Sequence, residues 1–441
     1  MKGLKERGRS TFLLILTIII LTALLFARDL LGVNFSKYVL VAVAVVSAMF
    51  MNHISLIYFI FFLFPVSIGL PSNFIFPLLS VILFLKKPAA FSRNATICFV
   101  IILVLELIHY PFYGFDIQLP DTIGYLTTIF FLCYLSVISD FEVQNRQCLL
   151  FFCLGLMVLF VAVWGITQIH GGGVEMLMVN SKRMGETKSF SETGDNNIMF
   201  SINSNGLAFF SLVGLAVLFV LYHHHKLRFV TFFLMSAVYV FIGALSLSRT
   251  WLMGVALLIV LFMIMIWNSH TEKKGLQVIL LIAVVLIAGY EMFHNELIYQ
   301  AFYNRMTESS MAGGNGRLEA MQIYNRALYD DPIFLLFGTG AVHYGNVLSE
   351  ISISIHNGLQ QILVSYGIIG LVFFLYITIK AFKRNYRKGF CVCAIPFIIA
   401  LFFIQSGQLL NPHYNLYFFI VSFTALRLCD DERYISLRNR E

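Results

Sequence analysis

The sequence predicts an all-α fold, a polytopic transmembrane helix bundle with about 12 to 14 membrane helices. Two observations predict it. Of the 441 residues, 59% are hydrophobic and only 12% are charged, which is more apolar sequence than a water-soluble domain of this length needs. The apolar residues also form separate runs, most of them long enough to cross a bilayer, which takes about 20 residues. The expected solvent, and the first partner, is the lipid bilayer.

About fourteen apolar runs can be read along the chain, and the third and fourth are short. They are centred near residues 19, 44, 61, 80, 103, 130, 158, 214, 238, 259, 284, 370, 398 and 421. About twelve spans remain if two of the weaker runs are re-entrant. The first run follows a basic segment and continues to about Phe26 without a small-residue cleavage pattern. We therefore expect it to be a retained helix rather than a cleaved signal.

The distribution of Lys and Arg predicts the orientation. With the N-terminus inside, 21 of the 30 Lys and Arg residues fall inside and 9 fall outside. Cytoplasmic segments carry the excess of Lys and Arg, so both termini are expected in the cytoplasm. Two long loops, about 170–203 and about 294–357, then face outside. The net charge of +7 is spread over short loops between apolar runs, so no nucleic-acid partner is expected.

The chain divides into three parts. Residues 1–200 hold the N-terminal membrane helices and the first outer loop, and residues 201–382 hold a core that includes the outer loop 294–357. Residues 383–441 hold the last membrane helices and a cytoplasmic tail. The sequence shows no internal repeat, which weighs against the transporter folds that are built from repeats.

The second outer loop contains a predicted amphipathic helix over residues 317–328. Apolar residues recur there at helical spacing, with Asn315-Gly316 before the segment and Asp330-Asp331-Pro332 after it. Such a helix can lie along the outer membrane–water boundary. Arg317 would stand in its first turn, beside backbone N–H groups that favour anions. The plain alternative is a solvated loop arginine.

Arg249 interrupts the apolar sequence within Ser246-Leu247-Ser248-Arg249-Thr250. An arginine at the edge of the hydrocarbon is costly and usually has an anion partner, although it can also extend from a helix end to the interface. The tight hairpin leaves it little freedom to swing away. A guanidinium suits phosphate because its planar fork donates paired hydrogen bonds. We therefore expect Arg249 to bind an anionic group on the outer side.

His356-Asn357 closes the second outer loop, just before a membrane helix whose Gly367 and Gly370 allow close packing. A packed histidine is the plain alternative. Yet an imidazole, with a pKa of about 6.5, is the commonest side chain for taking a proton from a hydroxyl at neutral pH. His356 is thus the candidate base, and Asn357 is its neighbour in positioning. No metal site competes, and no cofactor is expected.

Taken together, these residues resemble the O-antigen ligase and O-antigen polymerase superfamily. His356-Asn357 followed by Gly367 and Gly370 is similar to the histidine motif of that family. The pieces before it match in order: Ser204-Asn205-Gly206-Leu207-Ala208, Ser248-Arg249-Thr250, Gly316-Arg317, Pro332 and Phe337-Gly338-Thr339-Gly340. The resemblance covers roughly residues 200–380, and the N-terminal half matches only as generic membrane helices.

The resemblance implies a metal-independent glycosyltransferase that uses no nucleotide sugar. The donor would be a glycan on undecaprenyl pyrophosphate at the outer face of the bacterial cytoplasmic membrane, and the acceptor a glycan or a lipid. Arg249 and Arg317 would hold the leaving group, and His356 would assist the acceptor hydroxyl. Preorganised cations aimed at developing charge are a large catalytic term. Four residues are additional substrate-binding candidates: Arg183, Asn205, Asn357 and Glu106. The plain alternative for Arg183 is a solvated charge, and for Glu106 a buried polar pair with His109.

Polymerase and ligase share these motifs. We favour the polymerase, the broader set, which joins O-antigen, capsule or exopolysaccharide repeat units while they stay lipid-linked; a chain-length regulator is a possible partner. The alternative is a ligase that moves the glycan to the lipid A core of lipopolysaccharide or to another acceptor. A second alternative is a flippase of lipid-linked glycan, for which we would expect polar residues on both sides of the bundle and internal repeats. A receptor or assembly scaffold would need no base.

Overall fold

In the computed structural model, the described part of the chain folds into helices and their connections and contains no strand. The described residues are 2–87, 93–108, 143–171, 173, 184, 200, 202, 204–224, 226–268, 290, 294–307, 317–340, 355, 357–386, 392–404 and 420–428. The predicted all-α class is confirmed.

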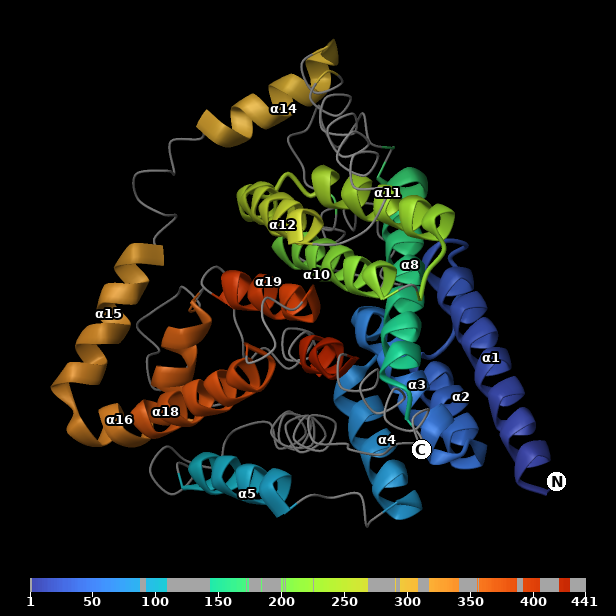
Figure 1. The fold of residues 1–441 in the computed structure, drawn as a ribbon, viewed down its shortest axis with the longest axis horizontal. Helices are drawn as coiled ribbons and strands as arrows, with labels where there is room; N and C mark the ends of the chain where they lie inside the picture. Colours follow the sequence, from blue (N-terminus) through green and yellow to red (C-terminus); the bar gives the residue numbers. More distant parts are fainter. Residues whose placement is uncertain are drawn as a thin grey trace.

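The helices follow one another in an order that matches the predicted apolar runs (Figure 1). The first half of the chain contains α1 (Lys2–Asp29), α2 (Lys37–Phe50), α3 (His53–Val66), the 3₁₀ turn η1 (Ser67–Gly69), α4 (Ser72–Lys86), α5 (Arg93–Leu107) and α8 (Asn145–His170). The second half contains α10 (Ser204–His223), α11 (Phe229–Leu245), α12 (Arg249–Asn268), α14 (Glu296–Thr307), α15 (Arg317–Asp330), α16 (Pro332–Phe337), α18 (Gly358–Tyr386), η6 (Val392–Ala394) and α19 (Ile395–Ile404).

Four of the described helices are long and apolar enough to cross a membrane: Gly8–Asp29, Asn145–His170, Ser204–His223 and Gly358–Tyr376. Six shorter apolar helices accompany them in the described part of the chain. The short third and fourth runs correspond to α3 and α4, with 14 and 15 residues. The runs centred near residues 130 and 284 lie outside the described residues. The multi-pass membrane class is confirmed, whereas the total of 12 to 14 helices stays a prediction.

Helix α10 is at the centre of the bundle. Within the apolar stretch of α10 that could cross the membrane, 89% is buried inside the protein. In the corresponding stretch of α1, only 33% is buried. Helices α8, α11, α12 and α19 all pack against α10, and Figure 1 shows it surrounded by them. In contrast, α1 exposes large apolar side chains such as Phe12 and Ile19. An apolar exterior of this kind fits contact with lipid, so α1 is peripheral and α10 is the core helix.

Helices α3 and α8 pack closely because a glycine lies at their crossing. A Cβ at Gly155 would overlap the carbonyl oxygen of Phe62 and lie 3.2 Å from the ring of Pro65. Small residues let two membrane helices bring their backbones together, which gives dispersion contacts that lipid tails would otherwise make. Nearly all of α3 is buried, so this pair forms the inner wall of the N-terminal half.

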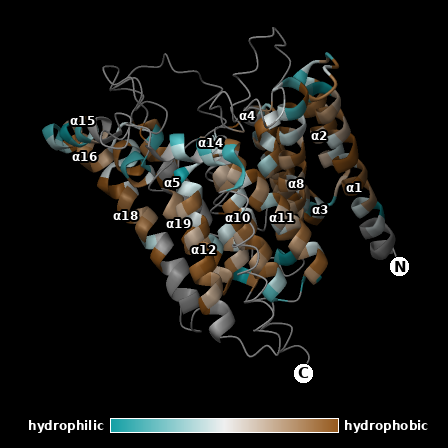
Figure 2. Cartoon of the chain, turned by 90° about the horizontal axis from the view of Figure 1, so that it is seen from above, coloured by the Kyte–Doolittle hydropathy of each residue, from teal (hydrophilic) through white to brown (hydrophobic). Residues whose placement is uncertain are grey.

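The two ends of the bundle differ in composition. Figure 2 shows α14 and α15, which contain many hydrophilic residues, at one end of the apolar helices. Two basic residues that are predicted to lie inside bind backbone carbonyls: Lys86 donates to Met49 at 2.8 Å and Arg146 donates to Lys226 at 3.3 Å. Which compartment each end faces stays a prediction.

Candidate active site

A tight turn between α11 and α12 carries Arg249, as the sequence predicts. Helix α11 ends at Leu245 and α12 begins at Arg249. The hydroxyl of Ser246 donates to the carbonyl of Gly243 at 2.6 Å, and Leu247 has a left-handed backbone with φ of 47°. A residue with a Cβ adopts that conformation at a cost of about 1–2 kcal/mol. The surrounding contacts must therefore hold this turn, in which Arg249 is half-buried.

Asn205 lies against this turn. The hydroxyl of Ser248 donates to Oδ1 of Asn205 at 3.0 Å, and Asn205 is in the first turn of the central helix α10. The structure thus brings two predicted site residues, Asn205 and Arg249, to the same place through Ser248. An amide and a guanidinium both bind phosphate or sugar oxygens by hydrogen bonds. This corner of the bundle therefore contains side chains of the kind that bind phosphate or sugar oxygens, and their role in binding a substrate stays a prediction.

Buried hydrogen bonds anchor the first turn of α12. Nε1 of Trp251 donates to Oγ of Ser211 at 3.0 Å, and that hydroxyl donates to the carbonyl of Tyr239 at 2.7 Å. A Cβ at Gly243 would overlap the indole nitrogen of Trp251, so the glycine makes room for the ring. Such polar contacts hold helices together in lipid. They fix α12 against α10 and α11, and with it the start of the helix at Arg249.

One residue of the first outer segment reaches the same turn. The backbone N–H of Met184 donates to the carbonyl of Leu245 at 3.3 Å, and the side chain of Met184 is buried. Met184, a described residue between α8 and α10, therefore packs onto the turn that precedes Arg249. Arg183, the candidate of that segment, lies outside the described residues.

A second group of contacts joins α15, α16 and α18. Helix α15 begins at Arg317, as predicted, and runs to Asp330. The amide of Gln360 donates to the carbonyl of Met321 at 2.9 Å and to Oδ1 of Asn325 at 3.0 Å. A small apolar core lies beneath these bonds: Tyr324, Leu328, Phe334, Ile355 and Val364. Nothing in the sequence singled out Gln360, because a glutamine near the start of an apolar run does not show which other helix it will meet.

Asn357 caps the N-terminus of α18. Its Oδ1 accepts the backbone N–H groups of Leu359 at 3.0 Å and Gln360 at 3.1 Å, the arrangement that makes asparagine a favoured N-cap. Ile355, two residues before it, is buried in the small core. His356 lies outside the described residues. The structure therefore gives Asn357 a role in the helix cap, and its role beside a catalytic base stays a prediction.

Two glycines let the chain after α16 cross α18 backbone to backbone. Gly338 and Gly367 have φ of 75° and 63°, and a Cβ at Gly367 would overlap the backbone of Leu336. The kink at Gly367 interrupts α18. The carbonyls of Val364 and Ser365 accept the N–H groups of residues 339 and 340 at 2.9 and 2.7 Å. In a bilayer such carbonyls need a partner within the protein, and the segment after α16 supplies it.

Replacing Gly367 by alanine should therefore destabilise the protein strongly. The new Cβ meets the backbone of Leu336 as well as the left-handed conformation, which alone costs about 1–2 kcal/mol. Gly32 is a matched control, because it has φ of 68° with nothing within 4 Å of its Cβ position. We expect the melting temperature in detergent to fall by several degrees more for Gly367→Ala than for Gly32→Ala. Equal shifts would show that the backbone crossing contributes nothing to stability.

Glu106 is buried near the end of α5, and α5 packs against α18. A buried carboxyl group in a membrane protein is costly and marks a functional or strongly bonded position. Its role in binding substrate stays a prediction. The described contacts thus assemble the candidates in two groups, Asn205 with Arg249 on one side and Asn357 with α15 on the other. Helix α19 lies between α12 and α18 in both views (Figures 1 and 2).

Fold and candidate site define an all-helical, multi-pass membrane protein with polar helix starts at one end of the bundle. Residues 239–375 match the model of the O-antigen ligase family. The match runs from α11 to α18, so it contains Arg249, α15 and Asn357, and it confirms the resemblance to the O-antigen ligase and polymerase superfamily. That family implies a glycosyltransferase-like ligase or polymerase whose substrates are a lipid-linked glycan and an acceptor. No curated protein matches the chain significantly.

Proposed function

We propose that this chain is a membrane glycosyltransferase that polymerises oligosaccharide repeat units carried on undecaprenyl pyrophosphate. The products would be O-antigen, capsule or exopolysaccharide chains, made at the outer face of the bacterial cytoplasmic membrane. The observation that carries the proposal is the family match over residues 239–375, which includes two arginines at helix starts, Arg249 and Arg317.

The proposed reaction forms one glycosidic bond and breaks one sugar–phosphate bond. The hydroxyl of the acceptor sugar attacks the anomeric carbon of the donor, while His356 takes the proton of that hydroxyl. The bond between the anomeric carbon and the pyrophosphate oxygen breaks, and undecaprenyl pyrophosphate leaves with the electron pair. Negative charge therefore grows on the pyrophosphate, which is where fixed cations lower the barrier most.

Arg249 supports this assignment through its location. It follows a turn that is held by Ser246, Ser248 and Asn205, so its backbone is fixed before any substrate binds. A guanidinium placed in advance needs little reorganisation when charge develops on the leaving group. Arg317 begins α15, and a helix N-terminus adds backbone N–H groups that favour anions. Asn205, Glu106 and Arg183 remain proposed contributors to substrate binding.

A ligase is the second candidate, and the description of the matching family favours it. A ligase would transfer the same donor to the lipid A core or to another acceptor. The bond that breaks and the leaving group are the same in both reactions. The difference lies in the acceptor hydroxyl, which comes from a second lipid-linked repeat unit in the polymerase.

The test uses the full chain purified and reconstituted in liposomes. Undecaprenyl-pyrophosphate-linked repeat unit is supplied alone, or together with lipid A core, and products are separated by size. We expect a ladder of lipid-linked products with the donor alone, and no ladder from the Arg249→Ala variant. Transfer only when lipid A core is present would assign the ligase. If the donor is not consumed in either mixture, both assignments are wrong.

A further inference from the structure

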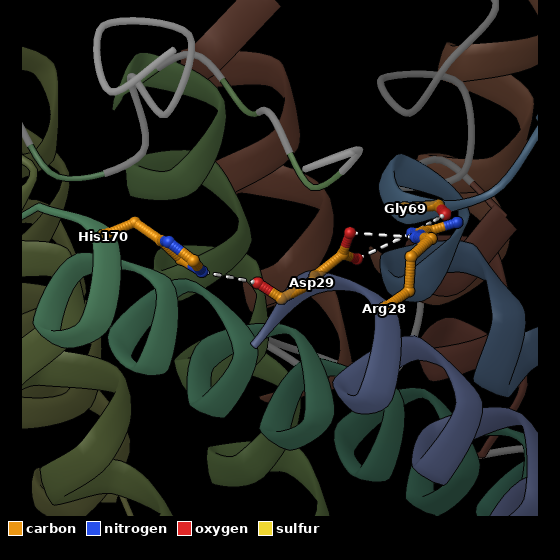
Figure 3. A network of polar contacts seen from close by, with 4 residues as sticks. All are labelled: Arg28, Asp29, Gly69 and His170. Carbon is orange, nitrogen blue, oxygen red and sulfur yellow. Dashed lines mark hydrogen bonds and ion pairs between the residues drawn. The ribbon is translucent and has the colours of Figure 1, made fainter. Parts of the chain in front are cut away.

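A buried ion pair joins three helix ends in the N-terminal half (Figure 3). Nε and Nη2 of Arg28 donate to the two carboxylate oxygens of Asp29 at 2.9 and 2.6 Å, and Nη2 also donates to the carbonyl of Gly69 at 2.8 Å. Arg28 is 3% exposed and Asp29 is fully buried. The pair thus binds the end of α1 to η1. The sequence offered no reason to single out Arg28, which is one of the nine basic residues predicted to lie outside.

The third helix end belongs to α8. Nε2 of His170, the last residue of α8, lies 3.2 Å from the carbonyl oxygen of Asp29. A carbonyl only accepts, so the imidazole N–H is the donor. Beside it, Leu30 packs on Gly165 of α8, where an added Cβ would approach Leu30 to 2.8 Å. The segment between α8 and α10 therefore starts at the ion pair.

The same segment also returns to the ion pair. Phe200 is fully buried, and its ring covers Gly69, whose added Cβ would lie 2.7 Å from the ring. Gly69 is the residue whose carbonyl binds Arg28. The segment leaves from one side of the ion pair at His170 and comes back to its other side at Phe200.

Between these two points, the segment touches the candidate site. Met184 donates its N–H to the carbonyl of Leu245, directly before the turn that carries Arg249. Met184, Phe200 and Ile202 are all buried in the main core. The described residues of the segment thus pack against the bundle and link the N-terminal ion pair to the α11–α12 turn.

We propose that the Arg28–Asp29 ion pair is a positioning element for the transfer reaction: it fixes both ends of the segment between α8 and α10 and so holds Met184 against the turn that carries Arg249. This role rests on the proposed function for its effect on the reaction. A buried bidentate arginine–carboxylate pair suits the task, because its geometry is directional and removing one partner leaves an uncompensated charge.

The experiment measures whether the ion pair controls the packing of Met184. A cysteine is introduced by Met184→Cys, and its reaction with a water-soluble maleimide is followed in membranes, relative to the same chain with Met184. Adding Asp29→Asn should speed labelling at least about tenfold, the factor expected for loss of one charge-assisted hydrogen bond. Since a lone buried arginine could block folding, the pair Arg28→Met with Asp29→Leu is tested in parallel, and it should also speed labelling.

The matched control disrupts the other end of the same helix. Ser10 of α1 donates to Oγ of Ser55 at 3.0 Å and accepts the N–H of Asn52 at 2.9 Å. Ser10→Ala should loosen α1 from α3 without changing the labelling of a cysteine at position 184. If Ser10→Ala speeds labelling as much as the ion-pair variants, general loosening of α1 explains the effect and the positioning role is wrong.

The donor assay separates this inference from the proposed function. In the Arg28→Met, Asp29→Leu variant with Met184 intact, we expect kcat to fall about tenfold or more while KM for the lipid-linked donor changes little, because Arg249 acts on charge that develops in the transition state and its turn is no longer held in place. Unchanged labelling in both ion-pair variants would overturn the positioning role. If the ion-pair variants are labelled faster at position 184 but the parent protein consumes no donor, the ion pair does hold Met184 in place. The proposed glycosyl transfer is then wrong.

Discussion

Replacing His356 by alanine should lower glycan transfer about 10²–10⁴-fold, the usual contribution of general acid–base catalysis. The protein should still insert and still bind the lipid-linked donor, because Arg249 and Arg317 are unchanged. His356→Gln should be about as poor, since an amide keeps hydrogen bonding but takes no proton at neutral pH. Initial rates with purified donor, at equal amounts of protein in the membrane, provide the measurement.

His294 is the control for this prediction. It also belongs to the second outer loop but is exposed and stacks on Tyr290 at 3.9 Å between ring centroids. His294→Ala should leave the rate near that of the parent. Near-normal turnover in His356→Gln would mean that His356 orients the acceptor or supports the fold, and that leaving-group stabilisation alone drives the reaction.

Replacing Arg249 by lysine should be nearly as damaging as replacing it by alanine. A lysine keeps the charge but cannot donate two parallel hydrogen bonds to a phosphate. Loss of one donor that stabilises developing negative charge typically lowers the rate about 10²–10³-fold. Because α12 stays anchored through Trp251 and Ser211, the loss should appear in the transfer rate and leave the folded amount of protein unchanged.

Arg326 provides the matched variant for this comparison. It is an exposed arginine in α15, so Arg326→Lys should be close to neutral. Transfer rates of the three variants, each normalised to the protein present in the membrane, give the result. Full activity in Arg249→Lys would identify Arg249 as an arginine that extends to the interface and would remove it from the proposed site.

Local features of this fold could be read from the sequence because they depend on neighbouring residues. The outer helix was predicted over residues 317–328 and is α15 at Arg317–Asp330. The hairpin before Arg249 and the limits of the first outer loop, about 170–203, also agree with the ends of α11, α8 and α10. Apolar periodicity, loop charge and helix stop signals are all short-range, which explains this success.

Long-range partners could not be read in the same way. Nothing in the sequence indicates that Gln360 would bind Asn325, or that Gly367 would lie against the backbone of Leu336. The backbone of Leu247 could not be predicted either, because a leucine in the sequence does not indicate a positive φ. These features follow from how distant helices pack, and single-sequence patterns carry only the local part of that information.

Insertion into the bilayer must bring residues 338–340 and α18 together. The kink at Gly367 interrupts α18, and the carbonyls of Val364 and Ser365 accept hydrogen bonds from the N–H groups of residues 339 and 340. Without those donors, each bare carbonyl in hydrocarbon would cost several kcal/mol. The donors precede α18 in the chain, so they are already synthesised when α18 leaves the ribosome. We expect residues 332–340 and 358–376 to enter the membrane as one unit during biogenesis, rather than as an isolated helix that finds its partner later.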